Sequence, residues 1–293
     1  MKIRLGIFVL TLLLLPFSGM LLSGKEWGEL ASGATPADGT AATVVIALAL
    51  LCTLLLSNLV VTLRTENNPL KVQRNYFLSV GVASAMLGWL LAYLNHYAAS
   101  WTTAQENTVW QAVLDTLLFA LLAPAVLSLR ALLGSFAGLL RCLARGPSIP
   151  APSAETQAFV LTPLVALGLI GGAAWPAQLF WLLWLAPLLL LTALQLLWHE
   201  STVFSGLKSG DWGRAVCAAL SGLVVGNLAV SGYQAAGGEL LVNLPLPFEQ
   251  AGYILFGLLC LQLGDVIAEQ WRGKTRFELF KRKPFPIPVT TKK

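Results

Sequence analysis

Apolar residues along the chain fall into long runs that short polar or proline-containing segments separate. A helix needs about 20 apolar residues to cross a hydrocarbon core about 30 Å thick, so a run of this length predicts a transmembrane helix. Eight such runs cover residues 4–23, 42–63, 76–97, 109–129, 157–175, 177–198, 213–233 and 250–269. The pattern predicts an all-α fold, a polytopic transmembrane helical bundle of about eight spans that forms a single transmembrane domain over residues 1–293.

The segments between the runs carry further expectations. Only Trp175, Pro176 and Ala177 separate the fifth and sixth runs, which predicts an antiparallel helical hairpin. Residues 146–154 contain three prolines and predict a flexible connector. Residues 240–249 are too apolar for an ordinary solvated loop, and we expect them to lie in the membrane interface or to dip back towards the bundle as a lid.

Basic residues lie almost entirely on one side of this predicted topology. With the amino terminus inside, every Lys and Arg except Lys25 lies at or beside a cytoplasmic segment. Because positively charged segments resist translocation, this asymmetry predicts a bacterial cytoplasmic (inner) membrane protein with both termini in the cytoplasm. The formal charge of +5 then indicates contact with anionic lipid headgroups, above all at the basic tail 270–293, and argues against a nucleic-acid partner.

The first run has a second interpretation as a signal peptide. Lys2 and Arg4 precede an apolar stretch, as in a signal sequence, but no clear small-x-small cleavage site follows. We favour a retained membrane anchor. Cleavage would leave seven spans with the remaining topology unchanged.

Composition agrees with the pattern and narrows the chemistry. The chain has 293 residues, of which 56% are hydrophobic and 11% charged, whereas soluble domains carry roughly a quarter charged residues. Its four cysteines form no CxxC pair, so the sequence suggests neither a metal site nor a disulfide framework. No nucleotide-binding or nucleophile motif is present, and no pair of embedded histidines is available for haem. We therefore expect no cofactor.

Four ionisable residues near the predicted outer face are candidate catalytic groups, because a charge within a membrane is costly. Asp115 lies about two turns into the fourth run, where it is either functional or a carboxylate that reaches interfacial water. His96 ends the third run, and with Glu106 and Asp115 it would form a proton-exchanging or metal-binding cluster; a solvated interfacial histidine is the simpler interpretation. Glu249 is a further candidate acid or base.

Asn227 is the candidate for substrate binding, because an amide embedded in hydrocarbon seeks a partner on another helix. It follows Gly222 and Gly226, whose spacing favours close helix packing. Similar pairs occur at Gly134 and Gly138 and at Gly168 and Gly172, and they are easily coincidental in a Gly-rich chain.

At the predicted inner face two groups of residues need an interpretation. Asp265 and Glu269 are a second location for enzyme chemistry. His199 and Glu200 we interpret as a solvated helix cap.

Three stretches carry a resemblance: residues 124–136, residues 210–214 leading into 220–226, and residues 244–257. Together they resemble a family of uncharacterised bacterial multi-spanning integral membrane proteins, and Gly210-Asp211-Trp212 is the most specific element. In that family aromatic and acidic residues typically follow the second glycine of the seventh span, whereas residues 227–233 here are Asn-Leu-Ala-Val-Ser-Gly-Tyr. The resemblance implies a fold and no activity.

Three functions fit these observations. Because pumps and ion-coupled transporters need charged relays near the membrane midplane, the scarcity of embedded charge favours a non-enzymatic accessory or scaffold protein, or a lipid-facing component, with a membrane protein as the expected partner. The alternative is a transporter or channel for a small or amphipathic solute, since Pro124, Pro163 and Pro187 could break spans. A membrane enzyme acting on lipid or polyprenyl substrates is the third hypothesis.

Overall fold

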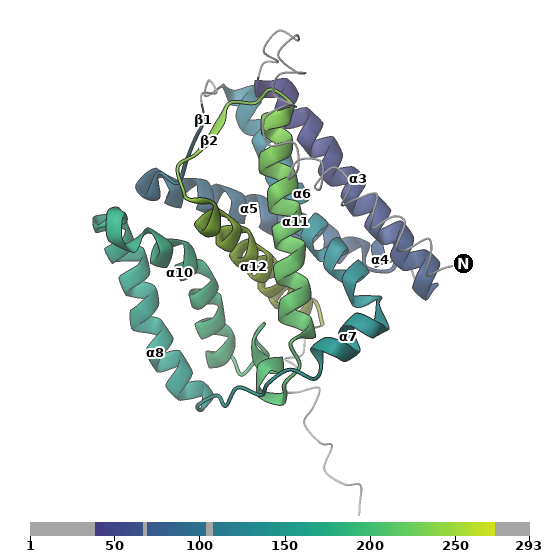
Figure 1. Cartoon of the computed structure of the whole chain (residues 1–293), viewed down its shortest axis with the longest axis vertical. Helices are drawn as coiled ribbons and strands as arrows, with labels where there is room; N and C mark the ends of the chain where they lie inside the picture. Colours follow the sequence, from purple (N-terminus) through teal and green to yellow (C-terminus); the bar gives the residue numbers. More distant parts are fainter. Residues whose placement is uncertain (1–38, 67–68, 104–107, 273–293) are drawn as a thin grey trace, which may run out of the picture.

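The chain folds as a helical bundle in which most helices are long enough to span a bilayer (Figure 1). The computed structural model describes residues 39–66, 69–103 and 108–272. Seven of the described helical segments are long and apolar enough to cross a membrane, and they coincide with the second to eighth predicted spans. The prediction of an all-α polytopic bundle is therefore confirmed. The first predicted span, the candidate Glu106 and residues 273–293 of the basic tail lie outside the described residues.

The elements follow one another in a simple order. They are α3 (Gly39–Thr65), α4 (Pro69–Val72), α5 (Arg74–Ala98), β1 (Trp101–Thr103), α6 (Val109–Gly134), α7 (Ala137–Leu143), α8 (Ala154–Ala166), the π-helical turn η1 (Leu167–Gly171), α9 (Gly172–Ala174), α10 (Pro176–Leu197), the 3₁₀ turn η2 (Ser205–Ser209), α11 (Gly213–Ala235), β2 (Leu240–Val242) and α12 (Leu246–Arg272). We call the end of the bundle with β1 and β2 the β end, and the end with α7 and residues 199–212 the α7 end (Figure 1).

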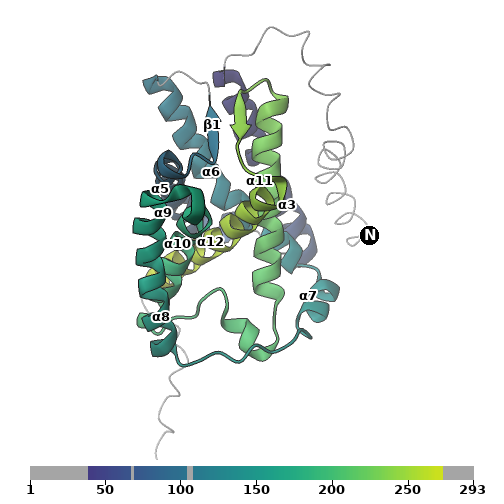
Figure 2. The ribbon, with the colours of Figure 1, turned by 60° about the vertical axis from the view of Figure 1, so that its left-hand side comes forward.

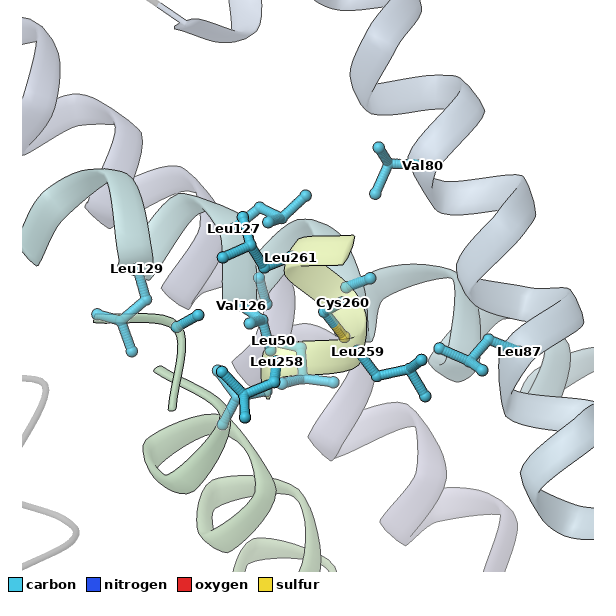
Figure 3. Close-up of a cluster of buried hydrophobic side chains, with 14 of the residues drawn as sticks. Leu50, Val80, Leu87, Val126, Leu127, Leu129, Leu258, Leu259, Cys260 and Leu261 are labelled. Atoms are coloured by element: carbon cyan, nitrogen blue, oxygen red, sulfur yellow. The ribbon is translucent and has the colours of Figure 1, made fainter. Parts of the chain in front are cut away.

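Helix α12 lies at the centre of the bundle and packs against α11, α10, α5 and α6. Its middle turn, Leu258 to Leu261, is buried on all sides among apolar side chains of the neighbouring helices (Figure 3). A helical turn that is apolar on every side is expected in such a position. By contrast, large side chains such as Leu48, Val82 and Met86 are exposed on outer helix faces. Exposed apolar surface on this scale is stable only against lipid.

Glycine lets α11 and α12 cross in direct backbone contact. A Cβ atom at Gly222 would lie 2.4 Å from the Cα atom of Gly257, and one at Gly257 would lie 2.2 Å from the carbonyl oxygen of Ala218. At Gly226 an added Cβ would meet the ring of Tyr253 at 2.5 Å. The expectation of close packing of the seventh span is thus confirmed.

The predicted helical hairpin is also present, with α8 and α10 side by side (Figure 2). Pro176 is the first residue of α10, a position where its missing N–H is not needed. Gly168 and Gly172 face α10, because a Cβ at either would lie within 3 Å of an atom of that helix. Gly134 and Gly138, the third pair, have no atom within 4 Å of an added Cβ, so their spacing has no packing role among the described residues.

Helix α6 is continuous from Val109 to Gly134, but near its middle a side chain of α5 bonds to its backbone. Pro124 has no N–H to donate. The hydroxyl group of Ser84 lies beside the backbone of the preceding residue, Ala123. The Ser84 hydroxyl donates to the carbonyl oxygen of Phe119 at 2.5 Å and accepts from the N–H of Ala123 at 3.0 Å. The hydroxyl therefore bridges two backbone groups in the turn that precedes Pro124, and neighbouring side chains of this kind help spanning helices to tolerate proline.

Residues 240–249, predicted as an apolar loop in the interface or against the bundle, hold a short strand and the start of a helix. Residues 240–242 form β2, which pairs antiparallel with β1. Asn243 donates to the carbonyl oxygen of Ala99 at 3.0 Å, and α12 begins at Leu246, earlier than predicted. The reason is that Pro247 lies in the first helical turn, where no N–H partner is required. The segment is tied to the ends of α5 and β1, and it is not an open lid.

The connector at residues 146–154 is likewise held in place at its start. Gly146 donates its N–H to the carbonyl oxygen of Gly210 at 3.1 Å, and the indole N–H of Trp212 donates to the carbonyl oxygen of Pro147 at 2.9 Å. Gly210 has φ +77°, a conformation that favours glycine. These bonds give the Gly210-Asp211-Trp212 element a structural role: it fastens the two halves of the chain at the α7 end.

Candidate functional site

Ionisable side chains from four parts of the chain converge at the α7 end. Gln262, Asp265 and Glu269 follow one another along α12 at spacings of three and four residues, so they share one face of the helix. This face meets the end of α10 and the first turn of α11. We call the group formed by Arg130, Arg214, Asp265, Glu200 and Glu269 the charged cluster.

Two arginines and one aspartate form one half of the charged cluster. The Arg214 guanidinium, in the first turn of α11, makes an ion pair with Asp265 of α12, and their side chains are 19% and 12% exposed. Arg130 of α6 lies close enough to interact electrostatically with Arg214 and Asp265, and Tyr76 and Cys217 are nearby. The Nε atoms of Arg130 and Arg214 are buried and find no hydrogen-bond partner among the described residues. Two guanidinium groups thus face a single carboxylate.

Two glutamates form the other half. Helix α10 ends in a Schellman motif, in which the N–H of Glu200 donates to the carbonyl oxygen of Gln195 at 2.8 Å and that of His199 to Leu196 at 3.1 Å. His199 takes the left-handed conformation, with φ 57°, and the motif turns Glu200 back towards α12. There the carboxyl group of Glu200 faces that of Glu269, which is 6% exposed. The interpretation of His199 as a helix cap is confirmed, but Glu200 is not merely solvated.

Burial is the main cause of the raised pKa of Glu200. Partial removal from water, together with the facing Glu269 carboxyl, raises the pKa of Glu200 to about 7. Both effects disfavour a second negative charge at this point. Glu200 Oε2 is also buried without a donor among the described residues. Glu200 is therefore suited to hold a proton near neutral pH.

Behind the charged cluster lies a network of uncharged polar side chains. Gln262, which is fully buried, contacts the Thr192 hydroxyl at 2.9 Å and the Gln195 amide at 2.8 Å. Buried amides are costly in hydrocarbon unless they pair, and here the pairing joins α12 to α10. The network fixes the face of α12 that carries Asp265 and Glu269.

The predicted outer-face candidates lie near the β end but do not form one site. Asp115 accepts from the Gln111 amide at 2.8 Å, and Gln111 also donates to Thr43 of α3 at 3.0 Å. His96 is exposed beside the ring of Tyr97, and Glu249 accepts a hydrogen bond from Tyr253. Among the described residues no hydrogen bond or ion pair joins Asp115, His96 and Glu249.

The predicted substrate-binding candidate Asn227 has a partner on another helix. It exchanges two hydrogen bonds with Gln250 of α12, at 2.7 and 3.0 Å, and also donates to the carbonyl oxygen of Leu223. The expected helix–helix contact is therefore present, and it occupies the amide of Asn227. In the described part of the chain no group of three His, Cys, Asp or Glu side chains is placed to hold a metal ion.

The charged cluster was only partly visible in the sequence. Asp265 and Glu269 stand out there as alternative acidic groups, whereas Arg130 and Arg214 are two among the many basic residues that predict the topology. The polar spacing along α12 is a signal that points to the site. The approach of Arg130 and Glu200 depends on helix packing and on a helix cap, for which the sequence gives no direct signal.

Comparisons with known proteins add no identity. No protein-family model, no curated protein and no solved structure matches the chain. The functional argument therefore rests on the geometry of the helices and of the charged cluster.

Proposed function

We propose that this protein is a non-enzymatic, lipid-facing membrane component that acts as an accessory or scaffold protein. The supporting observation is the location of charge in the described spans. Asp115 follows the first residue of α6 by six positions, Asp265 precedes the last residue of α12 by seven, and the other Asp, Glu, Lys and Arg residues of these spans lie nearer to helix ends. A pump or ion-coupled transporter would need such groups at the midplane.

The buried polar side chains support the same proposal. Asn58 donates to Ser128 at 2.7 Å, Asn227 pairs with Gln250, and Gln262 contacts α10. Each of these contacts joins two helices, so the polar groups stabilise the bundle. We place the protein in the bacterial inner membrane with the α7 end and both termini in the cytoplasm, on the basis of the Lys and Arg asymmetry. The basic tail would then contact anionic headgroups.

The experiment that tests this proposal is purification in mild detergent, followed by mass spectrometry of the proteins and lipids that co-purify. We expect a membrane protein in stoichiometric amount. The cellular role should also survive the combined substitutions Asp115→Asn and His96→Gln. Loss of that role at normal expression, together with a lone purified protein, would contradict the proposal.

A transporter is the second candidate function, and the proline-containing turn in the middle of α6 supports it. Irregular turns of spanning helices line the substrate sites of many transporters, and in α6 the Ser84 hydroxyl bridges two backbone groups beside Pro124. Solute flux into proteoliposomes that contain the purified protein would place this function first.

A further inference from the structure

We propose that Arg130 and Arg214 form a binding site for the phosphodiester group of an anionic phospholipid at the α7 end. The inference deepens the lipid-facing role proposed above and rests on it only for the source of the phosphate. The site is built by α6 and α11, with Asp265 of α12 as its one paired acid.

The first argument is the charge balance of buried groups. The charged groups that act on Arg130 are Arg214 and Asp265, and Asp265 already pairs with Arg214. A guanidinium group withdrawn from water is costly unless an anion compensates it. The Nε atom of Arg130 is buried and has no hydrogen-bond partner among the described residues. An anion beside Arg130 would offset this cost.

The second argument is the geometry of the donors. A guanidinium group presents up to five N–H donors in a planar fork that matches the oxygen atoms of phosphate. Arg214 uses an Nη atom to bind Asp265 and keeps its Nε donor unused among the described residues. Arg214 is in the first turn of α11, where the N–H of Gly213 already donates to the Asp211 carboxylate at 3.0 Å, so the donors on offer to an anion are those of the arginine side chains. Several donors are thus available on two neighbouring helices.

The third argument is the depth of the site. Arg130 precedes the last residue of α6 by four positions, about 6 Å along a helix axis. Arg214 is the second residue of α11. Headgroup regions occupy roughly the same distance on either side of the hydrocarbon core. The guanidinium groups therefore lie at the level of lipid phosphates, where a lipid at the edge of the bundle presents its headgroup.

The charge balance selects the kind of phosphate. A phosphodiester carries one negative charge. A phosphomonoester carries up to two at neutral pH, as phosphorylated side chains do. Its second charge would be repelled by the acidic residues at this end, which are Asp211, Asp265 and the facing pair of Glu200 and Glu269. We therefore expect preference for a singly charged anionic phospholipid such as phosphatidylglycerol over phosphatidic acid. Phosphatidylcholine shares the phosphodiester but brings its own cation, so it should bind more weakly.

The test is retention of lipid by the full-length protein, measured by native mass spectrometry after equilibration with mixed micelles of phosphatidylglycerol, phosphatidic acid and phosphatidylcholine. The wild type should retain one phosphatidylglycerol. Arg130→Gln should lower its affinity at least about ten-fold, the loss expected for a charge-assisted hydrogen bond. Arg130→Lys keeps the charge but lacks the fork, so it should give an intermediate loss.

Arg141→Gln is the matched control. Arg141 is an exposed arginine of α7 at the same end of the bundle, and it bonds only to the carbonyl oxygen of Ala137 among the described residues. Equal loss of lipid in Arg130→Gln and Arg141→Gln would reduce the effect to general surface charge and overturn the site. Unchanged retention in well-folded Arg130→Gln and Arg130→Lys proteins, judged by their melting temperatures, would also overturn it.

A final experiment distinguishes a lipid headgroup from a soluble phosphate compound as the ligand. Inorganic phosphate is titrated into the delipidated protein, and the melting temperature is followed. Stabilisation by inorganic phosphate without retention of phosphatidylglycerol, lost in Arg130→Gln, would overturn the lipid source and assign the site to a soluble phosphate compound. Failure of lipid retention with a stoichiometric protein partner present would leave the accessory role intact and reject only this site.

Discussion

Among individual residues, Glu200 has the most distinctive chemistry outside the spans. Its position follows from His199, which adopts a left-handed conformation usually taken by glycine and so reverses the chain at the end of α10. Because the reversed chain brings two carboxyl groups together, the charge of Glu200 should change in the physiological pH range.

This placement predicts how stability depends on pH. The folded protein holds the Glu200 proton up to about pH 7, whereas the ordinary pKa of a glutamate is 4.5. The stabilising effect of that proton is complete below pH 4.5 and is lost as the pH rises through 7. Glu200→Gln puts an uncharged side chain at this position, so the variant does not lose this stability as the pH rises. We expect its free energy of unfolding to exceed that of the wild type by about 1 kcal/mol at pH 8, after allowance for solvent screening, and to match it at pH 4.

Thermal unfolding in detergent at pH 4, 6 and 8 measures this difference. Glu239→Gln serves as the control, because Glu239 is exposed in the segment between α11 and β2. Its stability should follow the wild-type pH profile. If Glu200→Gln also follows that profile, the facing carboxyl groups do not interact as described.

Between elements, the crossing of α11 and α12 is the contact most sensitive to side-chain size. Gly222→Ala places a methyl group where the backbone of α12 lies, at 2.4 Å from an atom of Gly257, so the helices must separate. We expect a loss of about 1–3 kcal/mol in the free energy of unfolding, as for overpacked cores. Unfolding followed by intrinsic tryptophan fluorescence measures the change.

Gly252→Ala provides the comparison within α12. No atom lies within 4 Å of a Cβ at Gly252, so this variant should gain up to about 1 kcal/mol from helix propensity alone. Equal effects of the two substitutions would mean that the close crossing does not contribute to stability.

The proline-containing turn of α6 is a second feature at the level of elements. The Ser84 hydroxyl of α5 bonds to two backbone groups of this turn, so the two helices are coupled there. Gly88 of α5 lies one turn further on, and an added Cβ there would meet the ring of Phe119 at 2.3 Å. A relative movement of α5 and α6 would have to break this contact first.

For the whole molecule, the basic residues predict the orientation in the membrane. Cys142 of α7 and Thr102 of β1 are both exposed and lie at opposite ends of the bundle. In a chain without other cysteines, a membrane-impermeant maleimide should fail to label Cys142 in intact spheroplasts and should label it in inverted vesicles. Thr102→Cys, in a chain without Cys142, should show the reverse pattern. Labelling of Cys142 from outside would invert the proposed topology.

The sequence by itself determined the class of fold and the limits of most spans. In lipid each backbone polar group must bond within its own helix, so the length of an apolar run and its flanking charges are sufficient to locate a span. The departures occur at Pro247, where a proline begins a helix, and at residues 240–242, which pair with β1. Strand pairing with a distant segment leaves no mark in local hydrophobicity.

Only the tertiary structure decided which polar residues meet. Asp115, His96 and Glu249 stand out in the sequence because each is an ionisable residue near the end of an apolar run. No hydrogen bond or ion pair among the described residues joins them. Arg130, Arg214 and Asp265 come together because of the angles at which α6, α11 and α12 cross, and those angles depend on small residues such as Gly222 and Gly257. The free-energy cost of burying a polar side chain depends on the residue type and its neighbours in the sequence. The partner that offsets this cost depends on how helices far apart in the chain pack together.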